Sequence, residues 1–174
     1  MANTDRPHGF GGFGAHLRLN PYDVLVGYGT AIFIGDVVVM TADGTLEMAD
    51  TVSAQTKLGA SASHSAASTA TSSAEPLLVL DHPDQLFEAQ DDGVSVTVHQ
   101  NLIGSKADHI DTHSGSTTTL LSGHELDGSD MTSGAGGFAI LDLVQREDNT
   151  VANNADWVCQ LNTGEGLLTL AAGV

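Results

Sequence analysis

Residues 156–162 read DWVCQLN, and in this stretch large apolar side chains alternate with other residues. Successive side chains of a β-strand point to opposite faces, so Trp157, Cys159 and Leu161 would share one face of an extended chain. Aromatic side chains supply much of the burial in a core, and a free cysteine behaves as a small buried hydrophobe. The pattern therefore predicts a strand that places Trp157 and Cys159 in the core.

Other stretches of the chain carry the same kind of signal. PYDVLVGY at 21–28 and GVSVTVHQ at 93–100 alternate, whereas TAIFIGDVVVM at 30–40 and GFAILDLVQ at 137–145 are apolar on both sides. The apolar type is typical of central strands. Helical periodicity over three turns is nearly absent, and glycines separate the stretches. We therefore predict an all-β fold, a compact β-barrel or β-sandwich with an extended N-terminal arm. In the first alternating stretch the side chains expected on one face are Tyr22, Val24, Val26 and Tyr28.

The composition suggests an arm and one domain. Residues 1–16 are rich in Gly and polar residues, with Phe10 and Phe13 as the large apolar side chains, which fits either an extended arm laid on a neighbour or a disordered terminus. Residues 17–174 would form a single β-rich domain. Within it, residues 51–75 are rich in Ser, Ala and Thr and fit either a flexible linker or a loop or strand ordered against a partner.

The charge of the chain excludes one class of partner. Five basic residues face 22 acidic ones, which gives a net charge of −17. Such a surface repels phosphate backbones, so we expect no binding to nucleic acid. The apolar runs are far too short to span a bilayer, and the first ten residues lack the pattern of a secretory signal. We expect a soluble protein, with no membrane partner, assembled in a cytoplasm.

The histidines raise the question of a metal site. In ADHIDTH at 107–113, His109 and His113 are four residues apart, with Asp108 and Asp111 beside them. A helix would bring both imidazoles to one face for zinc, and a strand would also align them. The segment lacks the Glu of a metalloprotease helix and a third imidazole. We therefore interpret it as a surface cluster and expect no metal; the following pair His124–Glu125 is a weaker candidate still.

The carboxylates and serines give no clear catalytic signal. Neither DHPDQLFEAQDDG nor ELDGSD has the spacing of a calcium-binding EF-hand loop, although a weak cation site stays open. The nucleophile elbow of a serine hydrolase and the phosphate-binding glycine loop are both missing. We expect no catalytic residues, no cofactor and no enzyme activity. The acidic residues expected as solvated turn residues beside a strand are Asp81, Asp84, Glu88, Asp91 and Asp92.

Several segments, in order along the chain, resemble head decoration (cement) or capsid-associated proteins of tailed phages. They are MANTDRPHGF, GYGTAIFIGDVVVMTADGTLEMA with Ile34-Gly35-Asp36 at its centre, LVLDHPDQLFEAQDDG, GSTTTLLSGHELDGS and LVQREDNTVANNADWVCQLN. The resemblance covers roughly the whole chain, and its weight lies in the order of the segments. It departs at 51–75, at Lys106 and at the C-terminal LLTLAAGV.

The resemblance implies a structural virion protein on the outer surface of an icosahedral head. Its partner would be the major capsid protein, and self-association as a dimer or trimer would add avidity. The alternatives are a tail-tube or head–tail connector protein, or a receptor- or glycan-binding β-domain on the virion. The residues that we expect to contact the capsid are Arg6, Phe10, Phe13 and Arg18.

Overall fold

Twelve β-strands and no α-helix are found in the part of the chain that the structure describes. The structure is a computed structural model, and it describes residues 3–50, 55–67, 76–94, 102–111, 113–129, 131 and 136–162. Within these ranges no helix has the length and apolar character needed to cross a membrane. The prediction of an all-β fold is confirmed.

The first large sheet, sheet A, contains five antiparallel strands. Its order is β1 (Gly11–Gly12), β7 (Leu86–Gln90), β12 (Asp156–Leu161), β11 (Phe138–Leu143) and β8 (Lys106–Ala107). The strand predicted from DWVCQLN is therefore the central strand β12. The arm contributes edge strand β1, so part of it is an ordered element of its own domain.

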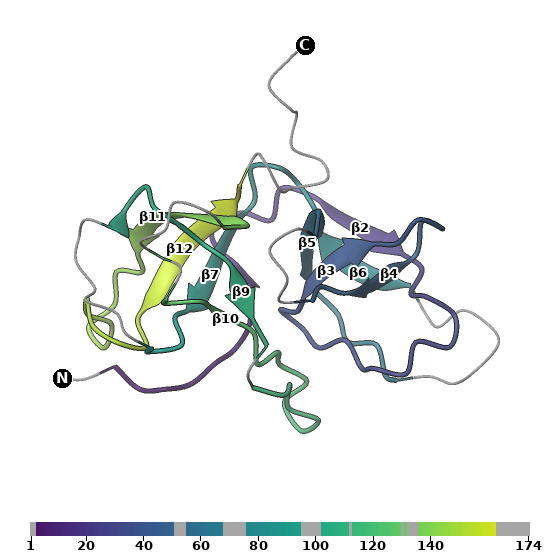
Figure 1. Ribbon diagram of the computed structural model, residues 1–174, viewed down its shortest axis with the longest axis horizontal. Coiled ribbons are helices and arrows are strands. Elements are labelled where there is room, and N and C mark those ends of the chain that lie inside the picture. Colours follow the sequence, from purple (N-terminus) through teal and green to yellow (C-terminus); the bar gives the residue numbers. More distant parts are fainter. Residues whose placement is uncertain are drawn as a thin grey trace, which may run out of the picture.

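The second large sheet, sheet B, also has five antiparallel strands and lies beside sheet A (Figure 1). Its order is β2 (Leu19–Tyr22), β6 (Leu77–Leu80), β5 (Lys57–Ser61), β3 (Val37–Met40) and β4 (Leu46–Met48). A two-stranded ribbon completes the described strands, with β9 (His109–Ile110) paired to β10 (Glu125–Leu126). No sheet closes into a barrel among these strands, so the arrangement consists of open antiparallel sheets.

Strand β5 lies inside the Ser/Ala-rich stretch 51–75. It pairs with β3 and β6 and is buried along its whole length. The stretch fits either a flexible linker or a segment ordered against a partner, and residues 57–61 are ordered as a strand. The strands that they pair with belong to the same chain. Residues 51–54 and 68–75 lie outside the described residues.

Sheets A and B share one apolar core. Alternation in β12 turns Trp157, Cys159 and Leu161 toward it, and all three side chains are buried, as predicted. Sheet B contributes Val37 and Val39 from β3 to the same core. Burial of this shared surface is the main term that holds the two sheets together.

The opposite face of sheet B has a second, smaller core. Val38, Leu58 and Val79 face it, and the chain that follows β2 covers it with Val24 and Ile32. The covering segment explains why the prediction for 21–28 is only partly right. Strand β2 ends at Tyr22, Val24 is buried, and the chain then turns so that Val26 is exposed.

Among the strands that the structure describes, β2 is an edge strand of sheet B, and Pro21 lies opposite Leu78 in its pairing with β6. The Leu78 carbonyl accepts from the Ala62 N–H and the Leu78 N–H donates to Ser63 Oγ, so both groups point away from β2. Pro21 and Leu78 therefore form a non-hydrogen-bonded pair, and the nitrogen of Pro21 faces the open edge without a hydrogen. This edge is protected against pairing with another strand.

A bulge in the pairing of β3 with β5 sets the direction of one charged side chain. Val38 pairs with Gly59 and Val39 pairs with Lys57, which leaves Leu58 as the extra residue. The bulge lets Leu58 face the smaller core while Lys57 shares the face of Val39, toward sheet A. A charged residue is thereby placed in the core between the two sheets.

Candidate functional site

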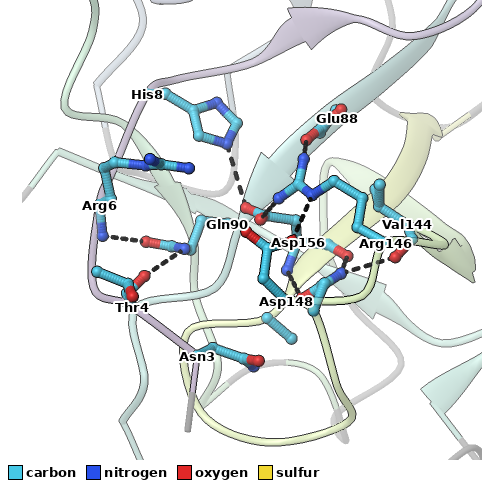
Figure 2. Close-up of polar contacts among 12 residues, drawn as sticks. Asn3, Thr4, Arg6, His8, Glu88, Gln90, Val144, Arg146, Asp148 and Asp156 are labelled. Carbon is cyan, nitrogen blue, oxygen red and sulfur yellow. Dashed lines mark hydrogen bonds and ion pairs between the residues drawn. The ribbon is translucent and has the colours of Figure 1, made fainter. Parts of the chain in front are cut away.

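The N-terminal arm is fastened to its own domain by a set of polar contacts, and Figure 2 shows those of Gln90 with Arg6 and Thr4. Asn3 Nδ2 donates to the carbonyls of Thr150 and Asn153 at 2.8 and 3.1 Å. Gln90, in β7, accepts from the Arg6 N–H at 2.7 Å and donates to the Thr4 carbonyl at 3.0 Å. Gln90 thus pairs two backbone groups of the arm, and the Asn3 side chain binds backbone carbonyls of the loop that precedes β12. We call these contacts the arm latch.

An ionic cluster lies beside the arm latch. His8 Nε2 is 3.1 Å from Asp156 Oδ1, and Arg146 hydrogen-bonds to both Asp156 and Glu88 (Figure 2). His8, Glu88 and Asp156 are close enough to one another to hold a metal ion. However, the Arg146 guanidinium already contacts both carboxylates and supplies the positive charge that they require. The cluster is explained as an ion-pair network that ties the arm to β7 and β12.

The four residues expected to contact a capsid lie in different environments. Phe10 is 1% exposed and stacks on Phe138 at a ring-centroid distance of 4.4 Å. The expectation is therefore wrong for Phe10, because its side chain fills the core of its own chain. Arg18 is bound to Asp81 through Nε at 2.7 Å. Arg6 is exposed, and Phe13 is half-buried at the surface.

Phe13 lines an apolar groove of about 370 Å³ on the outer face of sheet A. The Phe13 N–H donates to the Leu86 carbonyl, which continues the pairing of the arm with β7. Leu141 is 38% exposed there, in agreement with its outward direction in β11. We call this the sheet A groove; its apolar lining is Phe13, Leu86, Leu141, Leu143, Val144 and Val158.

A second apolar surface runs along the free edge of sheet B. Leu17, Leu19 and Leu78 are exposed by 49%, 44% and 37%, and Pro21 follows Leu19 by two residues in β2 and lies opposite Leu78 in β6. We call these four residues the β2 strip. Residues 13–19 connect the sheet A groove to the β2 strip, so one short segment joins two exposed apolar surfaces.

Asp81 is buried, which contradicts its interpretation as a solvated turn residue. Its carboxylate accepts hydrogen bonds from Arg18 Nε, Asn20 Nδ2 and Tyr22 OH at 2.7, 2.9 and 2.5 Å. Burial alone would raise the pKa of Asp81, but these hydrogen bonds outweigh it and lower the pKa below its usual value. Asp81 therefore anchors the polar face of β2, next to the β2 strip.

Asp91 is also buried, at the end of β7. Its carboxylate accepts from Trp157 Nε1 at 3.0 Å and from the backbone N–H groups of Gly93, Asn154 and Ala155. Burial raises the pKa of Asp91, and the hydrogen bonds counteract this only in part. The interpretation as a solvated turn residue is wrong here too, because the buried carboxylate accepts hydrogen bonds from N–H groups where β7 and β12 meet.

The histidines of the ADHIDTH segment do not lie together. His109 is 1% exposed, so the surface-cluster interpretation is wrong for it. Burial and then the nearby His124 and Lys57 lower the pKa of His109 to about 3. His113, by contrast, is at the surface, where its Nδ1 is 2.7 Å from Glu125 Oε2. Neither histidine belongs to the metal-compatible group found among the described residues.

A cavity of about 200 Å³ lies next to this region, and His124 and Asp36 line it. The Val37 N–H donates to His124 Nδ1 at 3.2 Å, so the neutral ring carries its hydrogen on Nε2. His124 Nε2 is 3.6 Å from Asp36 Oδ1. In this tautomer Nε2 carries a hydrogen and Nδ1 is occupied by the Val37 N–H, so the ring offers no free lone pair to a metal. The cavity therefore does not present the His124–Glu125 pair as a metal site.

Sequence reasoning missed most of the buried polar groups. Asp81 and Asp91 occur in an acidic run, which in isolation reads as a solvated turn. Buried positions of this kind have one sequence signal, a charged residue directly adjoining an apolar run, as Asp81 adjoins LLVL. That signal is also common at strand ends exposed to solvent, so it does not decide between the two.

Comparison with known proteins gives no relative from which a site could be transferred: no family model, no curated protein and no solved structure matches this chain.

Proposed function

We propose that this chain is a structural virion protein that binds the outer surface of an icosahedral capsid and stabilises the capsid across joints between subunits. The proposal is supported by the resemblance of its sequence segments to head decoration proteins. The observation that carries it is the pair of exposed apolar surfaces, the sheet A groove and the β2 strip, at the two ends of residues 13–19.

Exposed apolar surface on an acidic protein suggests specific binding. A net charge of −17 disfavours unspecific association, because like-charged copies repel each other. Clustered apolar side chains on such a surface mark sites of contact with other proteins. Two separate surfaces on one domain can touch two neighbouring subunits, which is what a protein that bridges a joint requires.

The stabilisation follows from linkage. A protein that binds the assembled shell and not the free subunits adds its binding free energy to the assembled state only. Many symmetric copies act together, and dimers or trimers of the chain would bind with avidity. Weak individual contacts are then sufficient. Of the four residues expected to contact the capsid, Phe13 and Arg6 keep this role in the proposal.

Heads that lack the protein provide the test. Purified protein is added back, and bound copies per head and the temperature of genome release are measured. We expect Leu19→Lys and Leu141→Lys to reduce binding strongly, because each places a charge on one apolar surface. Val26→Lys is the matched control, because Val26 is 47% exposed but lies in the turn after β2.

Three results would contradict the proposal. One is unchanged binding of both Leu19→Lys and Leu141→Lys. Another is equal loss of binding by the Val26→Lys control. The third is the formation of rings by the isolated chain in electron microscopy, which would favour a tail-tube or connector protein. A copy number in the hundreds per head supports the proposal.

A further inference from the structure

Lys57 is one of the two lysines in the chain, and its side chain is fully buried. Lysine is rarely buried completely, because removing its charge from water costs several kcal/mol. The β-bulge at Leu58 turns Lys57 away from the smaller core and toward sheet A. The sequence and the pairing thus place a primary amine in an apolar region between two sheets.

Asp108 lies directly in front of this amine. Lys57 Nζ and Asp108 Oδ1 are 3.4 Å apart, and the Asp108 side chain is only 8% exposed. The N–H of Gly137 donates to the same Oδ1 at 2.8 Å. A Cβ on Gly137 would lie 2.6 Å from Lys57 Nζ and 2.7 Å from Lys57 Cε, so the lysine chain packs flat against this glycine. Amine, carboxylate and a backbone N–H therefore converge in a site with little room for water.

We propose that Lys57 and Asp108 join in an intramolecular isopeptide bond. A buried ion pair carries a large desolvation cost, and replacing both charges by a neutral amide removes it. Escape of the released water from this apolar site also favours formation of the amide. The inference goes beyond the proposed virion role and does not depend on it.

The reaction needs no other reagent. The Lys57 nitrogen bonds to Cγ of Asp108, one carboxylate oxygen leaves, and two of the three ammonium hydrogens leave with it as water. The positive and negative charges cancel, so the product is a neutral amide. The Gly137 N–H is aimed at Oδ1 and stabilises the negative charge that develops on it during attack. Oδ1 then remains as the amide oxygen, and Oδ2 departs.

A buried histidine adjoins Asp108 in the sequence. His109 follows Asp108 in the chain, and its Nδ1 has no hydrogen-bond partner. Burial keeps this ring neutral, and its pKa responds to the charge of Lys57, so the two groups are within electrostatic reach. With a pKa of about 3 the ring is too weak a base to take a proton from the ammonium, so the proton passes within the ion pair, from Lys57 to the Asp108 carboxylate, and leaves with the departing oxygen as water.

The bond would connect the two halves of the fold. Lys57 belongs to β5 of sheet B, whereas Asp108 follows β8 at the edge of sheet A. A covalent link between positions 51 residues apart restricts the unfolded chain and makes the folded state harder to open. The two sheets would then stay joined at this point even when the main chain between them unfolded.

Intact-mass spectrometry of the folded, full-length protein is the test. We expect a mass lower than the sequence mass by one water molecule, and a branched peptide that joins the Lys57 and Asp108 fragments after proteolysis. Lys57→Met should restore the full sequence mass. Asp108→Asn should lose ammonia instead of water, because an amide nitrogen then leaves.

The wild-type measurement decides the question even if the variants fail to fold. A full sequence mass for the folded wild-type protein would overturn the proposal. Loss of water located in an unbranched peptide would also overturn it, since an Asp–Gly pair such as Asp127–Gly128 can lose water by forming a cyclic imide. Lys106→Met is the control for the second lysine, and it should leave the mass deficit in place.

Discussion

The indole Nε1 of Trp157 donates a hydrogen bond to Asp91 Oδ2 at 3.0 Å, inside the protein where β7 and β12 lie side by side. The other oxygen of Asp91 accepts from the Asn154 and Gly93 N–H groups. One carboxylate thus accepts hydrogen bonds both from the indole N–H and from backbone N–H groups that include one in the turn before β12. The chain's sole tryptophan is held in position by a residue from a different part of the sequence.

Asp91→Ala should therefore destabilise the protein strongly. It leaves several N–H donors without an acceptor, which we expect to lower the free energy of unfolding by at least about 3 kcal/mol. Urea unfolding followed by tryptophan fluorescence measures this. Asp43→Ala, at an exposed turn, is the control and should change stability by less than about 0.5 kcal/mol. Equal effects of the two substitutions would contradict the role of Asp91.

The two phenylalanines of the arm should behave differently. Phe10→Ala removes a buried ring that stacks on Phe138, so we expect a loss of about 3–5 kcal/mol in the free energy of unfolding. Phe13→Ala removes a half-buried ring at the surface and should cost less than about 1.5 kcal/mol. In the binding assay on heads, Phe13→Ala should nevertheless lower affinity. A Phe13→Ala variant that is as unstable as Phe10→Ala would place Phe13 in the core instead.

Gln90→Ala should open the arm latch. The substitution removes the acceptor for the Arg6 N–H and the donor to the Thr4 carbonyl, with an expected cost of about 1–3 kcal/mol. Hydrogen exchange should become faster at the amides of Thr4, Asp5, Arg6 and His8 and stay slow in β12. Gln145→Ala, at an exposed position, is the control. Unchanged exchange in the arm would show that the latch does not hold it.

Buried His109 should make stability depend on pH. Its pKa is about 3 in the folded protein and 6.5 in the unfolded chain, where burial and the neighbouring charges no longer act. Below pH 6.5 the unfolded chain binds a proton that the folded protein does not, so stability falls as the pH falls toward 3. The limiting slope is about 1.4 kcal/mol per pH unit.

The measurement is a series of urea titrations between pH 7 and pH 5. In this window the lowered pKa of Asp81 has little effect, since that carboxyl titrates at lower pH. His109→Phe should reduce the slope, whatever its effect on stability at pH 7. His16→Gln, at an exposed position, should retain the wild-type slope. An unchanged slope in His109→Phe would contradict the assignment.

Cys159 should be unreactive in the folded protein. The thiol is fully buried in β12, and burial raises its pKa well above the usual value, so thiolate is scarce. A thiol reagent should label the native protein only at the rate of unfolding, and the protein in urea at once. Rapid labelling under native conditions would mean that β12 is open to solvent.

The alternation of apolar and other residues predicted those strands whose side-chain directions depend only on apolar packing. Trp157 and Cys159 face the core as their period-two spacing indicates, and VVVM at 37–40 is a central strand buried on both faces. In these stretches every residue supports the same pattern. Local sequence and tertiary structure therefore agree.

The buried polar groups could not be predicted in the same way. Asp81 and Asp91 look like turn residues in the sequence, and their partners come from segments far away along the chain. Lys57 faces the core because of a bulge, which shifts the register by one residue and reverses the expected side-chain direction. Phe10 is surrounded by glycines in the sequence, yet its ring stacks on Phe138 in the core, and a Cβ on Gly9 would lie only 2.8 Å from the Gly35 carbonyl oxygen, so the arm passes close to the chain before β3. Long-range pairing decides all of these positions.

Pro21 has a consequence for how copies of this protein behave when they are crowded. An outer strand with a full set of amide hydrogens can template growth of a continuous cross-β ladder, and concentration drives that growth. Because the nitrogen of Pro21 faces outward and carries no hydrogen, two copies brought edge to edge lack a bond at the middle of the strand. At this edge, neighbours packed at high density therefore gain less from strand pairing.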